Sequence, residues 1–362
     1  CEMPYRKAAA AVSGMTGQQV SHTAAWKVIQ AVGERIEGQE QQAAMDAAAC
    51  CGRGRHESKL LFEEMDGIWL KLQGKDRKEY GQSKEMKLSI AYDGAKKTGK
   101  KRYELQNKVA CANFEESQYF MRRKEGIIAD YYVADEIEMR ILNGDGARWI
   151  QGSIESDETH YQLDTFHRNK AIARAVRQPA IRRKILRHLY NKQTDDALES
   201  IEILSNSVVD ERERQELLGL YNYLKNNEAG LIGYHRRGLD LPAPPEGLVY
   251  RRLGAMESNV FSLVGFRMKR RRATWSIAGG NNLARLLCLK ATRRLAEPLR
   301  NAMGTILPPE YTVETTRILR ESQVDRRIGK GFDGFHHFAP PRQRTWLKDL
   351  LSQKPFSTMT LQ

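Results

Sequence analysis

The chain has 362 residues, of which 41% are hydrophobic and 29% charged, so it can bury a substantial core in two or three domains. Its formal net charge of +14 favours polyanionic partners such as nucleic acid. No apolar run approaches the ~18 residues that cross a bilayer, so no membrane partner is expected. The five cysteines include no CxxC pair, which argues against a disulfide framework or a zinc site and favours a reducing cytoplasm.

The first 38 residues predict two helices around a short turn. Residues 4–13 are rich in alanine, two glycines follow, and Ser21 is a suitable N-cap for a second helix that reaches Ile36. Both a plain helical hairpin and a DNA-binding helix-turn-helix have this pattern. In a helix-turn-helix, three side chains off the apolar stripe would contact DNA: His22, Thr23 and Lys27.

Residues 39–57 are rich in Gln, Ala and Gly and then charged, which predicts a linker. Short apolar runs separated by turn-like stretches follow, and residues 58–167 would form the first part of a core. These runs predict three strands, a helix and two further strands: 59–72, 84–95, 101–112, 114–131, 137–142 and 159–164. This order is typical of an α/β fold with a ribonuclease-H-like mixed sheet, in which the first strand is central and the fourth lies beside it.

Residues 168–245 change to a helical composition and predict an all-helical insertion. Residues 246–300 would return to the core, and residues 301–362 have no assigned role. From Arg267 to Arg300 there are ten Lys or Arg residues and one acid, which predicts a nucleic-acid contact. The densest part would contact phosphates from a helix over 256–272: Arg267, Lys269, Arg270, Arg271 and Arg272. Residues 279–282 (GGNN) predict a loop, which would either present N–H groups to a phosphate or be a plain loop with an Asn N-cap.

Three acidic residues stand at positions suited to catalysis. Asp66 lies inside a predicted strand, where aspartate is disfavoured, Asp145 ends the fourth predicted strand, and Glu257 opens a helix. Each also has an ordinary explanation, because aspartate is common in turns and glutamate stabilises helix starts. Together they predict a site for two divalent ions, since carboxylates hold the ions that stabilise the attacking and leaving oxygens of a phosphodiester.

Several blocks of the sequence resemble a bacterial insertion-sequence transposase family, the ISLre type, which is distantly similar to the Mutator-type transposases. They include LFEEMDGIWLKLQGKDR, EIEMRILNGDGARWI, VYRRLGAMESNV and RMKRRRATWSIAGGNNLARLLCLKAT. The resemblance extends from about residue 4 to residue 292. It implies a DDE transposase, in which a ribonuclease-H-like core is interrupted by helices.

By this resemblance Asp66 and Asp145 would be the two catalytic aspartates and Glu257 the glutamate, all three holding two Mg²⁺ or Mn²⁺ ions. The Mutator-type enzymes also carry a Cys-x-x-His pair after the second aspartate. Here the matching residues are Asp164 and His167, so the histidine is present and the cysteine is replaced. His167 would either contact the scissile phosphate or support the site.

The function implied is a cytoplasmic transposase that binds the ends of its own element and a target DNA, as a homo-oligomer. It would cleave the element ends and transfer the freed strand into the target. Two alternatives remain at this stage. One is a metal-dependent DNA nuclease or resolvase without strand transfer, and the other is a DNA-binding protein descended from a transposase that has lost its activity.

Overall fold

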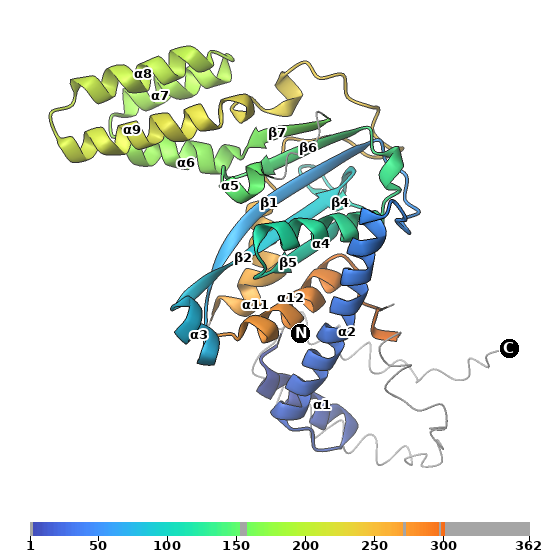
Figure 1. Cartoon of the computed structure of the whole chain (residues 1–362). Helices are drawn as coiled ribbons and strands as arrows, with labels where there is room; N and C mark the ends of the chain where they lie inside the picture. The colour runs from blue at the N-terminus through green and yellow to red at the C-terminus, as the bar shows by residue number, and fades with distance from the viewer. Residues whose placement is uncertain (1–2, 153–157, 271–272, 297, 301–362) are drawn as a thin grey trace. The chain divides into compact units, whose positions relative to one another are not determined.

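The computed structural model describes residues 3–152, 158–270, 273–296 and 298–300 (Figure 1). Two units are distinguished: one contains Met3–Val28, and the other contains the described residues from Ile29 onward. Helix α1 (Tyr5–Thr16) and the beginning of α2 (His22–Ala48) belong to the first unit. The two helices expected at the N-terminus are therefore present.

The linker prediction is wrong for residues 39–48, because α2 continues to Ala48. This half of the helix is held by tertiary contacts. Glu40 accepts a hydrogen bond from Arg123 and another from Arg285, and Ala43 is buried. Gln, Ala and Glu also favour helix once such contacts exist.

The second unit contains a five-stranded mixed sheet in the order β5-β2-β1-β6-β7. The central strand β1 pairs antiparallel with β2 and parallel with β6, while β2–β5 is antiparallel and β6–β7 parallel. The bounds are β1 Leu60–Lys71, β2 Ser83–Tyr92, β5 Val109–Asn113, β6 Met139–Gly144 and β7 Thr159–Leu163. The expected mixed α/β architecture is thus confirmed.

The single strand expected over 101–112 is wrong, because the chain turns within it. Asn107 has a left-handed φ of 51°, which asparagine tolerates better than most residues. Its side chain donates to Asp93 at 2.7 Å, which fixes the turn. The residues before it form β4 (Tyr103–Gln106), which pairs with β3 (Gly94–Lys97) in a separate hairpin, and the residues after it form β5.

Alternation along β1 divides its side chains between two layers. Leu61 packs with Ile128 of α4 (Ser117–Ala129), and Glu63 binds Lys124 of the same helix at 2.5 Å. Phe62 faces the opposite side, where its ring contacts Tyr234. The elements that complete this face and the β5 edge are α10 Met256–Val260, a π-helical turn Phe261–Gly265, α11 Phe266–Met268 and α12 Ile277–Ala291.

Four helices lie beside the β7 edge of the sheet (Figure 1). They are α6 Thr165–Ala175, α7 Pro179–Tyr190, α8 Thr194–Ser207 and α9 Glu211–Asn226. Their apolar residues form one core with Leu142, Tyr161 and Leu163 of β6 and β7.

The shorter elements are α3 Gly74–Tyr80, α5 Arg148–Gln151 and the 3₁₀ turns Ala134–Glu136, Glu228–Gly230 and Tyr234–Arg236.

Within the described residues, no helix is long and apolar enough to cross a membrane.

The turn after β6 depends on Gly146, which has a φ of +92°. A Cβ atom there would lie 2.9 Å from the ring of Tyr223. We expect Gly146→Ala to lower the free energy of unfolding by about 1–3 kcal/mol, because the new side chain adds backbone strain and displaces α9. Gly219→Ala is the matched control: Gly219 lies exposed within α9 with open space around it.

Gly219→Ala should raise stability by about 0.5–1 kcal/mol, because alanine is the better helix former. Urea denaturation followed by circular dichroism measures both variants. Equal stability of Gly146→Ala and the wild type would contradict the assigned turn.

Candidate metal centre

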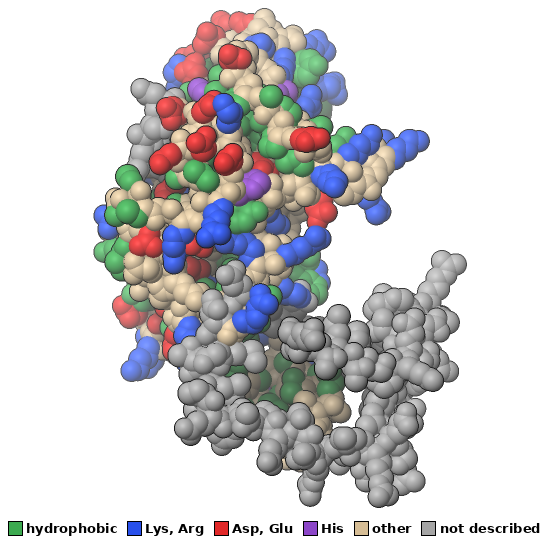
Figure 2. Space-filling model, turned by 90° about the vertical axis from the view of Figure 1, so that its right-hand side faces the viewer, with side chains coloured by type: hydrophobic (Ala, Val, Ile, Leu, Met, Phe, Trp, Pro, Cys, Tyr) green, Lys and Arg blue, Asp and Glu red, His purple; other side chains and the backbone are tan. Residues whose placement is uncertain are grey.

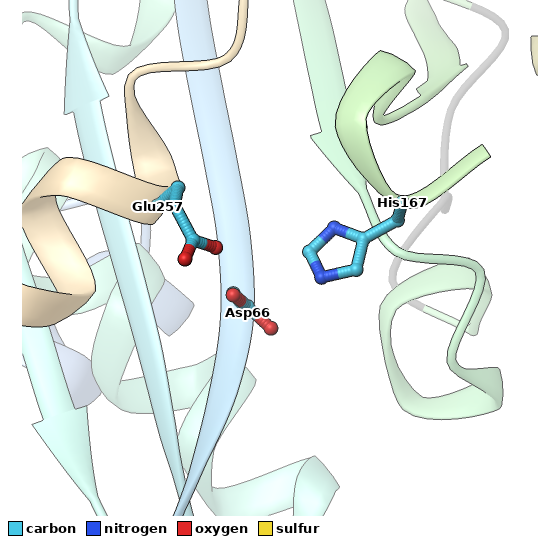
Figure 3. A group of neighbouring side chains, drawn as sticks. All are labelled: Asp66, His167 and Glu257. Atoms are coloured by element: carbon cyan, nitrogen blue, oxygen red, sulfur yellow. The ribbon is translucent and has the colours of Figure 1, made fainter. Parts of the chain in front are cut away.

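Asp66, His167 and Glu257 come together on one face of the sheet (Figure 3). Each offers a ligand atom, and these atoms all lie within 4.8 Å of one another. Asp66 comes from β1, His167 from the first turn of α6 and Glu257 from the first turn of α10. In Figure 3 the imidazole and the glutamate approach the Asp66 carboxylate from opposite sides.

Asp66 is a buried carboxylate with few partners. Its side chain is 9% exposed, and the one hydrogen bond it accepts in the described structure comes from the N–H of Gly67, at 2.7 Å. The pKa of Asp66 is raised to about 6, mainly by burial; the N–H of Gly67 and His167 act to lower this pKa, and the nearby carboxylates of Asp145 and Glu257 act to raise it. The ionised form of Asp66 therefore lacks stabilisation that a cation would supply.

Asp164 orients His167. Its Oδ1 caps helix α6 by accepting the N–H of His167 at 3.0 Å, and it also lies 3.2 Å from Nδ1 of the ring. This hydrogen bond is the main cause that raises the pKa of His167 above its usual value. With Nδ1 held by Asp164, Nε2 is the ring nitrogen left for Asp66 or an ion. A carboxylate behind the ring is the usual arrangement for a metal-binding histidine.

Glu64 holds the segment that carries Glu257. It lies two residues before Asp66 on the same face of β1 and is fully buried. Its carboxylate accepts N–H groups from three successive residues: Gly254 at 2.9 Å, Ala255 at 3.2 Å and Met256 at 3.3 Å. N–H groups at a helix start lack partners within the helix, so Glu64 caps α10 from the sheet.

The same carboxylate reaches the histidine side of the cluster. Glu64 accepts from the hydroxyl of Tyr92 at 2.7 Å and from Nδ2 of Asn143 at 3.1 Å. Asn143 also donates to Asp164 at 3.0 Å, and Asp164 holds His167. Burial raises the pKa of Glu64, but all five hydrogen bonds are donated to its oxygens and so favour the carboxylate form.

Asp145 lies beside the cluster rather than within it. It directly follows β6, whose pairing with β1 ends at Glu64 and Asn143, so the continued register would place Asp145 opposite Asp66. Its Oδ1 accepts the N–H of Ala147 at 2.9 Å, and its main-chain oxygen accepts the Tyr223 hydroxyl at 2.7 Å. The structure therefore joins Asp66, Glu257 and His167, and leaves Asp145 outside the group of converging ligand atoms.

The prediction of one regular helix over 256–272 is wrong, because the π-helical turn Phe261–Gly265 interrupts it. This turn changes which face of the helix the later residues occupy. Arg267 lies over the ring of Trp275, and Arg270 lies within 5.1 Å of the rings of Phe261 and Phe266. Lys269 is exposed, and Arg271 and Arg272 lie outside the described residues. His22, Thr23 and Lys27 are exposed on α2, in the other unit.

The loop expected over 279–282 is also wrong, whether as a phosphate-binding loop or as one with an Asn N-cap, because these residues are buried within α12. The N-cap is Ser276, whose side chain accepts the N–H of Gly279. Asn281 accepts the N–H of Phe114, and Asn282 donates to Gln30 at 3.0 Å. The two asparagines therefore join α12 to neighbouring elements.

Two functional positions were missed by the sequence analysis. Glu64 could have been found by the argument used for Asp66, namely that a carboxylate is unusual inside a strand. The two residues are two positions apart, so their side chains lie on the same face of the strand. Asp164 was noted as the residue in place of a cysteine, but its role as helix cap was not foreseen. An Asp three residues before His167, at a strand-to-helix junction, is a recognisable capping signal.

The fold and the cluster define an α/β protein whose mixed sheet carries a group of possible metal ligands on one face. The chain matches the uncharacterised protein family UPF0236 over residues 1–296, and it belongs to that family. It is similar to a Streptococcus gallolyticus protein described as "UPF0236 protein in vanSb 3′region". The two are 22% identical over 336 residues, which cover 90% of this chain and 69% of the relative.

The raised pKa of Asp66 predicts how stability depends on pH. Between the ordinary pKa of 3.8 and about 6, the folded protein holds a proton that the unfolded chain releases, so stability falls as pH rises through this range. In EDTA, Asp66→Asn should therefore be more stable than the wild type above pH 6, by up to about 3 kcal/mol, and equally stable below pH 4.

Urea denaturation across pH 3.5–8 measures this difference, with Asp240→Asn as the control on an exposed aspartate. A gain for Asp66→Asn that is the same at every pH would contradict the assignment.

Substitutions at two adjacent glutamates, Glu63 and Glu64, test the hydrogen bonds that Glu64 accepts. Glu64→Gln places an amide NH₂ against N–H donors, so the α10 segment should shift and the Asp66 centre should bind Mn²⁺ about 10–100-fold more weakly. Glu63→Gln is the control, because Glu63 faces α4 and binds Lys124 and Arg140. It should lower stability without changing Mn²⁺ affinity, measured by electron paramagnetic resonance. Equal losses of Mn²⁺ affinity in both variants would contradict the role assigned to Glu64.

Proposed function

We propose that this protein is a DDE-type transposase, which cleaves DNA at the ends of its element and joins the freed strand to a target. The observation that carries the proposal is the convergence of Asp66 and Glu257, which are far apart in sequence and come from β1 and α10. Their approach fits the arrangement implied by the resemblance to the ISLre-type transposases.

The strand order supports a ribonuclease-H-like core. Two antiparallel strands lie on one side of β1 and two parallel strands on the other. Asp66 lies on the central strand, and Asp145 follows the strand beside it. Helices α6–α9 stand between the last strand and the segment that carries Glu257. This is the expected position of a helical insertion.

The donor set fits a hard divalent cation, Mg²⁺ or Mn²⁺. Two carboxylates and an imidazole converge, and Asp66 accepts one hydrogen bond, from the N–H of Gly67, within the described residues. When bound, a pair of such ions stabilises both the attacking and the leaving oxygen of a phosphodiester. Asp66 would hold both ions, Glu257 and Asp145 would each hold one, and His167 would contribute Nε2 or hold the scissile phosphate.

Cationic side chains that follow Glu257 in the sequence suit a DNA substrate. Lys269 and Arg270 are exposed shortly after Glu257 in the sequence, and Arg270 is ordered by two phenylalanine rings. On the face drawn in Figure 2, Lys and Arg side chains are spread over the upper and middle parts and the right-hand projection, whereas Asp and Glu are most frequent in the upper part. In this proposal the protein acts on DNA in the cytoplasm as a homo-oligomer.

Substitution of the carboxylates tests the proposal. Asp66→Ala and Asp145→Ala should each lower the rate of Mg²⁺-dependent nicking of a terminal-repeat oligonucleotide by more than about 100-fold, because each removes several kcal/mol of transition-state stabilisation. DNA binding in EDTA should stay intact, and Asp240→Ala serves as the exposed control.

Gel analysis of nicked and joined products separates the outcomes. Nicking that persists in both carboxylate variants would overturn the metal assignment. Cleavage by the wild type without any joined product would indicate a nuclease instead of a transposase.

A further inference from the structure

A second site lies on the same face of the sheet as Asp66. It is a cavity of about 580 Å³ bounded by the β3–β4 hairpin, by residues 249–255 and by the end of α12. Phe62 and Tyr92 form part of its floor, and Asp66, His167 and Glu257 are not among its lining residues. The cavity is therefore separate from the cluster, although Ala255 and Ser258 next to Glu257 contribute to its wall.

The lining of this cavity is strongly cationic. It includes five Lys or Arg residues and one acid, a net charge of +4 (5 − 1). The cations are Lys108, Arg251, Arg252, Arg293 and Arg294, and the acid is Glu104. Such an excess around one hollow attracts an anion, and planar guanidinium groups match the geometry of a phosphate.

The five cations are not equally engaged within the protein. Arg293 pairs with Glu104 at 2.9 Å, and Arg294 pairs with Asp130 at 3.6 Å. Arg251 and Arg252 form no ion pair with any acidic side chain of the described residues. The guanidinium of Arg251 instead lies 3.8 Å from the centre of the Tyr103 ring, which orders it without neutralising it.

One segment connects this cavity to the metal centre. Arg251 and Arg252 are separated by Leu253 alone from Gly254 and Ala255, whose N–H groups bind Glu64, and Glu257 follows two residues after Ala255. Along β1, Phe62 precedes Asp66 by four residues, or about 13 Å of strand. A DNA strand advances about 3.4 Å per nucleotide along the duplex axis, so the cavity and the cluster lie within reach of one strand over a few nucleotides.

We propose that this arginine cavity binds backbone phosphates of the DNA strand whose neighbouring phosphodiester lies at the Asp66 cluster. The inference rests on the proposed function, because it takes DNA as the substrate. It adds a binding site for the flanking phosphates, with Arg251 and Arg252 as the contact residues. Because these two residues share a segment with Glu257, phosphate binding in the cavity also fixes the position of that carboxylate.

The test measures how DNA binding depends on salt, in EDTA, so that the result does not depend on bound metal. The change is Arg251→Ala/Arg252→Ala, measured with a fluorescent duplex by anisotropy over a range of salt concentrations. The slope of log Kd against log salt should fall by about 2, because two phosphate contacts are lost. Arg251→Lys/Arg252→Lys keeps the charge and should retain most of the slope.

Arg212→Ala/Arg214→Ala is the matched control, because it removes the same charge from exposed positions on α9. It should leave both Kd and the slope close to the wild-type values. A circular dichroism melt establishes that each variant is folded. An unchanged slope in the folded Arg251/Arg252 alanine variant, or an equal loss in the α9 variant, would overturn the inference.

Other outcomes separate this inference from the proposed function. Wild-type protein that binds DNA with the expected loss in the variant, yet never cleaves it, would leave the cavity assignment standing and overturn the transposase proposal. Wild-type protein that binds no DNA would overturn both.

Discussion

The buried carboxylate of Glu64 fixes the geometry on which the rest of the site depends. A charge removed from water costs several kcal/mol unless donors replace the lost hydration, and here five donors do so. Three of them open α10 and thereby place Glu257. A fourth, Asn143, reaches Asp164 and thereby places His167. Glu64 therefore links the central strand to α10, which carries Glu257, and through Asn143 and Asp164 to α6, which carries His167.

Asp66 stands two residues further along the same strand in a contrasting environment. Glu64 has five donors, whereas Asp66 has one backbone N–H and two neighbouring carboxylates, and burial raises its pKa to about 6. The first carboxylate is therefore held in place by hydrogen bonds, and the second is one whose charge still needs a counterion. This difference is the physical basis for assigning a cation to Asp66 and not to Glu64.

Local pattern was enough to predict most strands, because alternating apolar runs and turn residues mark them directly. Asp66 and Glu257 were selected by the resemblance to the ISLre-type transposases more than by local pattern, and the structure brings these two together. What local pattern could not provide depends on tertiary contacts. The turn at Asn107 is fixed by Asp93, the extension of α2 by Arg123 and Arg285, and the burial of residues 279–282 by packing of α12. The exclusion of Asp145 from the converging atoms likewise depends on how its turn is held by Tyr223.

The central claim is that Asp66 and Glu257 share a divalent cation. Crystals of the wild-type protein soaked in Mn²⁺ test it most directly, because manganese can be located by its anomalous scattering. We predict a peak about 2 Å from carboxylate oxygens of both Asp66 and Glu257, and no such peak in Asp66→Asn crystals. Manganese that occupies other sites while this position stays empty would contradict the account.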